Sequence, residues 1–333
     1  MKHRLPLGWM SVWIACVIGA WAGPAQSLVL TTRHVYGREY VAMGDVMRVF
    51  GLRGQVNRDR TVMLTSSQVR VRLTVDSREA EVQGVKYWLS APLALHSHQV
   101  WVPAIDVVKT LDPLLRRTGL AAVWPLRTIV IDPGHGGPDQ GTHARNGLSE
   151  KTLTLDLAKR LQVLLAQRGY RVLLTRNDDR EMSLDSRSAF ARAQKSDLFV
   201  SLHFNSSAPS AEPRGTETFC LTPAGAQSTS TKGGTLSVAD FVSFSGNRFD
   251  NDNVVLAHCI QQGLVGRTGA VERGVKRARF EVLKDLTCPG VLVECGFLSN
   301  ASDVRLISQS THRDRLAMAV LAGIETYKKA ANR

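Results

Sequence analysis

The segment TIVIDPGHGG, residues 128–137, decides the fold of the longer part of this chain. A short β-rich apolar run leads up to Asp132, which is typical of a buried strand. The glycines that follow allow the backbone to turn sharply after the strand. His135 is therefore expected just past the carboxyl end of a strand, where open α/β sheets bind their ligands.

Strand-like and helix-like segments alternate after this turn. Residues 150–168 place apolar side chains along one helical face, and Gly169 ends that helix. Further strands are predicted at 170–175, 197–202, 215–221 and 290–294, and further helices at 183–195 (with Ser183 as N-cap), 252–265 and 303–328. The alternation predicts an α/β fold, with a mixed, largely parallel sheet flanked by helices.

The preceding residues form a different unit. With 333 residues the chain is long enough for two domains. Over 27–118 we predict a small strand-rich α+β domain, on the basis of apolar alternation at 69–75, β runs at 62–64 and 100–102, and a short helix at 43–50. It holds no cluster of histidines and acids, which favours a binding or regulatory role. The larger, catalytic domain is predicted over 127–329.

The amino terminus predicts export. A basic head, an apolar run from Leu7 to about Ala20 and a small-x-small site at 20–22 are typical of a secretory signal peptide over residues 1–22. A membrane anchor is the alternative, but the run is short for a span of about 20 apolar residues. A lipoprotein cysteine at Cys16 is disfavoured by Trp13. We expect a protein of the periplasm or cell envelope without integral membrane contact.

The expected mature chain is basic. Removing Lys2 and Arg4 leaves 40 basic against 29 acidic residues, about +11. This surplus favours a polyanionic neighbour. For an exported protein an anionic envelope polymer or membrane face fits better than nucleic acid, and a generally basic surface is the simpler alternative. Four remaining cysteines permit disulfides without establishing any: Cys220, Cys259, Cys288 and Cys295.

Four residues are predicted to meet at one edge of the sheet. His135, His203 and Glu294 each follow or end a predicted strand, and Glu150 opens the helix after the His135 turn. Two imidazoles and a carboxylate with an open fourth position form a common catalytic zinc site. Zinc lowers the pKa of bound water toward about 7, and a separate carboxylate can carry the proton. Hydrolysis is the predicted chemistry.

Each residue taken singly has a simpler explanation. A histidine at a strand end is usually structural, an acid opening a helix usually interacts with the helix dipole, and Glu294 could pair with an arginine. The glycine-rich turn lacks the GxGxxG spacing and the Lys-Ser/Thr of nucleotide sites. The metal-site prediction therefore depends on the convergence of all four.

Five ordered segments give the chain a specific resemblance: IDPGHGG, the Ser149-Glu150 helix start, SLHFNS, RGVKRARFEVLK and PGVLVECGFLSN. Over about residues 127–329 the chain resembles the zinc-dependent N-acetylmuramoyl-L-alanine amidases that cleave peptidoglycan. The resemblance implies peptidoglycan as substrate and Zn²⁺ as cofactor. The roles that it implies are metal ligands at His135, Glu150 and His203, a catalytic glutamate at Glu294, and a site-lining position at Asn205.

Residues 207–250, rich in Ser, Thr, Gly and Pro, are expected to form a loop that borders the substrate groove. Some members of the family carry a blocking insertion that a partner displaces, so an activator protein is left open. We expect a monomer.

The first domain resembles the copper amine oxidase-like N-terminal domain, through Tyr40-Val41, residues 87–92, Val102-Pro103 and residues 111–115. No copper site is expected, and His96 and His98 are expected to be exposed loop histidines.

Two other functions fit part of the pattern. A zinc peptidase that cuts the stem peptide would also use two histidines, a glutamate ligand and a separate glutamate base. A wall-binding protein without activity could keep the fold, although the presence of all four residues argues against it. The products and the zinc content would separate these possibilities.

Overall fold

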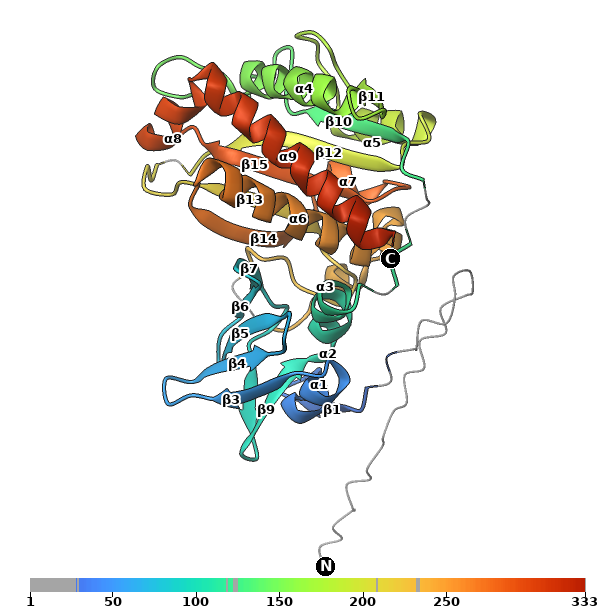
Figure 1. Cartoon of the computed structure of the whole chain (residues 1–333), viewed down its shortest axis with the longest axis vertical. Helices are drawn as coiled ribbons and strands as arrows, with labels where there is room; N and C mark the ends of the chain where they lie inside the picture. Colours follow the sequence, from blue (N-terminus) through green and yellow to red (C-terminus); the bar gives the residue numbers. More distant parts are fainter. Residues whose placement is uncertain are drawn as a thin grey trace, which may run out of the picture.

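The computed structural model describes residues 28, 30–117, 119–121, 125–207, 209–231 and 234–332. The predicted signal peptide lies outside these residues. The first part, drawn in blue and teal in Figure 1, consists mainly of short strands. Its elements are β1 (Thr32–Val35), β2 (Arg38–Ala42), α1 (Met43–Val49), β3 (Arg53–Val56), β4 (Thr61–Thr65), β5 (Arg70–Thr74), β6 (Glu79–Val82), β7 (Val85–Trp88), β8 (Ala94–His96), β9 (Gln99–Pro103), α2 (Ala104–Asp106), the π-helix η1 (Val107–Leu111) and α3 (Asp112–Leu115).

The second part alternates strands and helices, as the sequence predicts. Its elements are β10 (Thr128–Pro133), α4 (Glu150–Ala166), β11 (Arg171–Leu174), α5 (Leu184–Ala193), β12 (Leu198–Asn205), β13 (Thr216–Leu221), the 3-10 helices η2 (Val238–Phe241) and η3 (Ser245–Phe249), α6 (Asp250–Thr268), β14 (Glu272–Ala278), α7 (Glu281–Lys284), β15 (Gly290–Phe297), α8 (Ala301–Ile307) and α9 (Ser310–Ala331). Ser183 caps α5 by accepting a hydrogen bond from the Ser186 amide.

The sheet of the second part has the order β11-β10-β12-β15-β13-β14. β10 pairs in parallel with β11 and β12, β12 with β15, and β13 with β14, whereas β13 runs antiparallel to β15. The predicted mixed, largely parallel sheet is confirmed.

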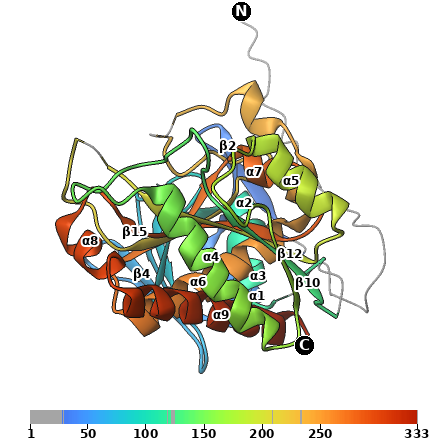
Figure 2. The same ribbon diagram turned by 90° about the horizontal axis from the view of Figure 1, so that it is seen from above.

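Helices cover both faces of this sheet. Figure 2 shows α9 and α6 on one side of the strands and α5 and α7 on the other. Leu202 and Val293 belong to the core shared with α4, α6 and α9, and Phe199 and Leu292 to the core shared with α5 and α7. Because side chains alternate along a strand, His203 and Glu294 share the face of Phe199 and Leu292.

The two parts are joined through the sheet itself. β7 pairs with β14 at Tyr87 and Val275, so the sheet continues into β6, β5, β4 and β3, while β1, β2, β9 and β8 form a separate sheet. The Tyr87 hydroxyl lies 2.6 Å from Nδ1 of His258 in α6, and both residues are buried. Backbone pairing therefore crosses between the two parts of the chain. The predicted domain boundaries, 27–118 and 127–329, stay a prediction.

The structure corrects three details of the sequence analysis. β12 and β15 extend to Asn205 and Phe297, so His203 and Glu294 lie inside the last residues of their strands and do not end them. The predicted helix over 303–328 is two helices, α8 and α9. Gln309 between them has an extended backbone (φ −79°, ψ 127°), and Arg313 donates to the carbonyls of Ile307 and Ser308 at the end of α8.

The third correction concerns residues 207–250. Because β13 is antiparallel to β15, only the residues before Thr216 lie at the edge that carries Glu294. The described residues after Leu221 start at the opposite edge. There, Arg78 donates to the carbonyl of Thr231, and the amide of Thr229 donates to the carbonyl of Arg277 in β14, so this part of the segment lies against the first part of the chain and β14.

None of the helices in the described part of the chain combines the length and the apolar character that a membrane crossing needs.

The buried His258 predicts an acid-dependent loss of stability. Burial lowers the pKa of His258 to about 4 from its ordinary value of 6.5. As the pH falls below about 6.5, the unfolded chain therefore takes up a proton that the folded chain refuses, and stability is lost down to about pH 4. His258→Asn should reduce the stability difference between pH 7 and pH 4 by about 3 kcal/mol, measured by urea unfolding. An unchanged pH dependence would contradict this role of His258.

Candidate metal centre

A buried ionic network fixes the turn that carries His135. The carboxylate of Asp132, at the end of β10, accepts hydrogen bonds from Thr175 Oγ1 (2.6 Å), Arg187 Nη1 (2.8 Å) and Ser201 Oγ (2.8 Å). Asp132 and Arg187 are both buried. Arg187 also donates to the carbonyl of His135 at 2.8 Å. The network therefore ties β10, β12 and α5 to the turn.

A second buried arginine holds the turn to helix α4. Arg176 is fully buried, and its Nη2 donates to the carbonyls of Gly134 and Lys151, each at 2.8 Å. Lys151 in turn donates from Nζ to the carbonyl of Gly137 at 2.8 Å. His135 has a φ of 63°, a left-handed conformation that is uncommon for a residue with a side chain. These contacts stabilise the backbone that points the His135 imidazole toward Glu150.

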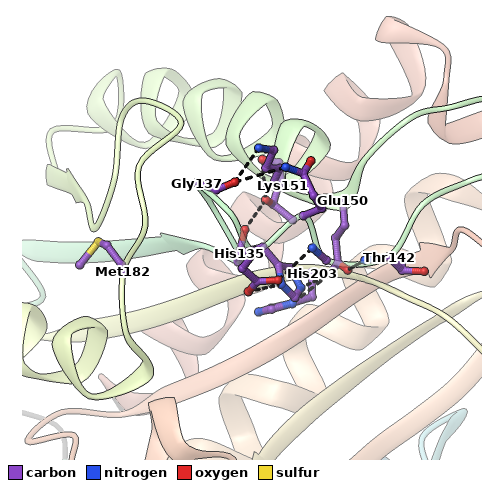
Figure 3. Close-up of polar contacts among 12 residues, drawn as sticks. His135, Gly137, Thr142, Glu150, Lys151, Met182 and His203 are labelled. Carbon is purple, nitrogen blue, oxygen red and sulfur yellow. Dashed lines mark hydrogen bonds and ion pairs between the residues drawn. The ribbon is translucent and has the colours of Figure 1, made fainter.

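His135, Glu150 and His203 converge at the carboxyl edge of the sheet, pointing toward one another in Figure 3. Glu150 Oε1 lies 3.0 Å from His135 Nε2 and 3.0 Å from His203 Nδ1. The three side chains offer ligand atoms that all lie within 4.8 Å of one another. The imidazoles are partly exposed and Glu150 is buried, which leaves one side of the group open.

The donor set fits a zinc ion. Two neutral nitrogens and one carboxylate oxygen are zinc ligands, and bonds of about 2.0–2.2 Å to a shared tetrahedral ion place ligand atoms about 3.3 Å apart. The observed separations from Glu150 Oε1, 3.0 Å each, are close to this spacing. Burial alone would raise the pKa of Glu150, but hydrogen bonds from both histidines hold it well below its usual range. Glu150 is therefore a carboxylate, the form that binds a cation.

Glu150 is also held by two backbone amides. The amide of Phe204 donates to Oε1 and that of Thr142 to Oε2, each at 3.0 Å. The carboxylate is thus fixed from the strand side by β12 and from the loop side by the residues before α4.

Asp139 is a residue that the sequence analysis missed. Its Oδ2 lies 2.8 Å from His135 Nδ1, on the side of the ring away from Glu150. A carboxylate in this position fixes the tautomer and orientation of a metal-binding histidine. Its spacing of four residues from His135 is the only sequence signal, and it is weak because the intervening residues form an irregular turn.

Glu294 lies beside the three converging residues. In the strand register it is opposite His203 of β12 on one side and Glu217 of β13 on the other. Its buried Oε2 has no hydrogen-bond partner among the described residues. Burial raises the pKa of Glu294 well above its usual value, and the negative charges of Glu150 and Glu217 act in the same direction. The unpartnered oxygen lies where a carboxyl group could accept a proton and pass it on.

Glu217 and the two cations that pair with it are charged residues to which the sequence analysis gave no role. It is buried, and its carboxylate is paired with Lys276 and, at 3.0 Å from Oε2, with Arg273 Nε of β14. Asn205 Nδ2 donates to Oε1 at 2.7 Å, which gives the predicted site-lining residue a contact. Arg273 and Lys276 belong to the segment RGVKRARFEVLK, which carried no assigned role for them.

Other metal-capable residues stay apart from this group. Within the described ranges, His135, Glu150 and His203 are the group that could hold an ion, and His96 and His98 belong to none. The four cysteines are free and buried, so the described residues form no disulfide.

Comparison with known sequences identifies the longer part of the chain. The family described as N-acetylmuramoyl-L-alanine amidase matches residues 129–326. The amidase AmiC of Escherichia coli O6:H1 is 34% identical over 60% of this chain and 52% of that protein. The amidase LytC of Bacillus subtilis is 36% identical over 60% of this chain and 35% of that protein. The chain thus aligns with about half of the first relative and about a third of the second.

Solved structures show the same fold. The catalytic domain of the amidase CwlV from Bacillus (Paenibacillus) polymyxa is 29% identical, with a TM-score of 0.51 over 61% of this chain and 99% of that one. The CwlD amidase of Clostridioides difficile, solved in complex with the GerS lipoprotein, is 28% identical, with a TM-score of 0.50 over 60% of this chain and 98% of that one.

Asp139→Asn should weaken zinc binding about 10- to 100-fold, because the amide no longer fixes His135 in the metal-binding orientation. Competition with a chelator measures the affinity. Asp178→Asn, on an exposed carboxylate paired only loosely with Arg180 at 3.7 Å, serves as control. Equal zinc affinity in wild type and Asp139→Asn would contradict the orienting role.

Arg187→Met should lower the free energy of unfolding by about 3–5 kcal/mol, because it leaves the Asp132 carboxylate buried without its cation. Urea unfolding measures this. The control is Arg72→Met, which removes an exposed pair with Glu81 and should cost less than about 1 kcal/mol. Similar losses in the two variants would contradict the stabilising role of the buried Asp132–Arg187 pair.

Proposed function

The chain belongs to the N-acetylmuramoyl-L-alanine amidase family, and we propose that it hydrolyses the amide between N-acetylmuramic acid and L-alanine in peptidoglycan, with Zn²⁺ as cofactor. The observation that carries the proposal is the convergence of His135, Glu150 and His203. Within the proposal these three residues hold the ion, and Glu294 is the catalytic glutamate. Residues 127–329 form the catalytic domain, and 27–118 a binding or regulatory domain resembling the copper amine oxidase-like N-terminal domain.

The residues divide the chemistry between them. A bound zinc ion supplies a lowered pKa for the attacking water and polarisation of the scissile carbonyl. Glu294 accepts the proton of that water through its carboxylate and then donates it to the departing amide nitrogen. The buried Oε2 of Glu294, which has no hydrogen-bond partner among the described residues, supports this role because no other group competes for it. Asp139 keeps the His135 ring in place, and the amides of Thr142 and Phe204 hold the Glu150 carboxylate.

A zinc peptidase acting on the stem peptide is the second candidate. It would use the same four residues, so the site geometry alone fits both. The family match favours the amidase. A wall-binding protein without activity would need neither the buried Glu150 beside two imidazoles nor Glu294 in register with His203.

The cellular role is also a proposal. We place the protein outside the cytoplasm, in the periplasm or cell envelope, acting in cell-wall remodelling or cell separation. The predicted signal peptide at residues 1–22 and the basic composition support this. We propose a monomer that contacts peptidoglycan, neither binding nucleic acid nor inserting into a membrane. The complex of the CwlD amidase with the GerS lipoprotein supports a partner protein, and we propose an activator in that place.

Glu294→Gln should keep zinc but lower turnover by at least about 100-fold, because the amide cannot carry the proton. Digested peptidoglycan is analysed by mass spectrometry, in which an amidase releases intact stem peptides with an L-alanine amino terminus. Glu281→Gln, on a partly exposed glutamate paired with Lys284, should behave as wild type.

Three outcomes would contradict the proposal. Normal release of stem peptides by Glu294→Gln would remove Glu294 from the mechanism. Fragments cut within the stem would indicate a peptidase. Purified wild-type protein that takes up no zinc would favour a binding protein.

A further inference from the structure

Arg273 pairs with Glu217, the register neighbour of the proposed catalytic Glu294, and the hydrolysis described above does not use it. Its Nε donates to Glu217 Oε2 at 3.0 Å, and its guanidinium lies over the ring of Phe297, 4.8 Å from the ring centroid. The Arg273 side chain is 29% exposed. The guanidinium is therefore fixed on two sides and open on a third.

The open side carries the two terminal nitrogens. Among the described residues neither Nη1 nor Nη2 of Arg273 has a hydrogen-bond acceptor, whereas both terminal nitrogens of Arg176 and of Arg187 donate to protein oxygens. A planar guanidinium with both terminal nitrogens free matches the two oxygens of a carboxylate. Since its orientation is already set by Glu217 and Phe297, little conformational freedom is lost when an anion binds.

The charge around Arg273 also favours an anion. Arg273 and Lys276 pair with the same oxygen of Glu217. One carboxylate therefore lies between two cations. Lys276 is held further by the ring of Trp88 in β7, at 5.4 Å from its centroid. Within the cluster that these three residues form, the two positive charges of Arg273 and Lys276 thus exceed by one the negative charge of Glu217, the carboxylate that contacts both of them directly.

The position of the cluster sets which part of a substrate it could reach. Glu217 is the register neighbour of Glu294, and adjacent strands lie about 4.8 Å apart. Phe297, beneath Arg273, lies three residues beyond Glu294, which is about 10 Å along a strand. An extended peptide covers about 3.3–3.6 Å per residue. A group on the second residue after the scissile amide lies about 7 Å from that amide. This distance falls between the two that separate Glu294 from Glu217 and from Phe297.

We propose that Arg273 binds a free carboxylate on the second residue of the stem peptide and makes the enzyme prefer acidic stems to amidated ones. This specificity rests on the proposed amidase function. Arg273 contributes through binding and does not take part in the proton transfers.

The test compares two synthetic muramyl peptides that differ only in a carboxylate or a carboxamide on the second stem residue. Zinc-loaded full-length wild type should show a KM about tenfold lower for the carboxylate, the size expected for a charge-assisted hydrogen bond. Arg273→Met should lose this preference, and Arg273→Lys should keep part of it because the charge is retained. Arg72→Met, which removes an arginine from an exposed pair with Glu81, should keep the full preference.

Calorimetry provides a second readout that needs no turnover. The corresponding free dipeptides, with carboxylate or carboxamide, are titrated into zinc-loaded Glu294→Gln with and without Arg273→Met. The carboxylate form should bind about tenfold more weakly when Arg273 is replaced, and the carboxamide form equally to both.

The inference is overturned if wild type treats both substrates alike, if Arg273→Met keeps the preference, or if neither dipeptide binds. If wild type cleaves neither substrate, the amidase proposal fails. The calorimetric comparison then decides the role of Arg273 separately.

Discussion

The site depends on the ion pair and hydrogen bonds made by the buried carboxylate of Asp132. This carboxylate accepts hydrogen bonds from residues of β12, α5 and the segment after β11, and so it fixes three elements against the end of β10. An ionised carboxylate is costly to bury unless it is paired and hydrogen-bonded, and here Arg187 supplies the pair. Because Arg187 also binds the carbonyl of His135, the same network that satisfies Asp132 sets the direction of the first histidine.

The rest of the site follows from strand alternation and register. His203, Glu294 and Glu217 stand on one face of three adjacent strands, opposite one another in register. This arrangement puts two carboxylates next to each other in a buried setting, which raises the pKa of Glu294. Lys276 and Arg273 pair with Glu217, whereas Oε2 of Glu294 has no hydrogen-bond partner among the described residues, which suits its proposed role in proton transfer.

The first part of the chain takes part in this arrangement through β7. Tyr87 contacts His258 on the face of the sheet that α6 covers, and the next residue, Trp88, lies against Lys276 on the opposite face. One strand therefore contributes to the core on one side and to the charged cluster on the other. The small strand-rich unit is thereby in contact with the charged cluster of Glu217, Arg273 and Lys276.

Much of the site could be predicted from the sequence, because each of its main residues sits in a local pattern. The strand and turn around His135, the helix opening at Glu150, and the apolar runs before His203 and Glu294 are signals within a few residues. They determined the fold class and the residues that converge. The extension of β12 and β15, the break before α9, Asp139, and the cluster around Glu217 were decided only by the tertiary structure. The reason is that strand register and the antiparallel placement of β13 join residues that lie far apart in the chain, and no local pattern encodes which strands become neighbours.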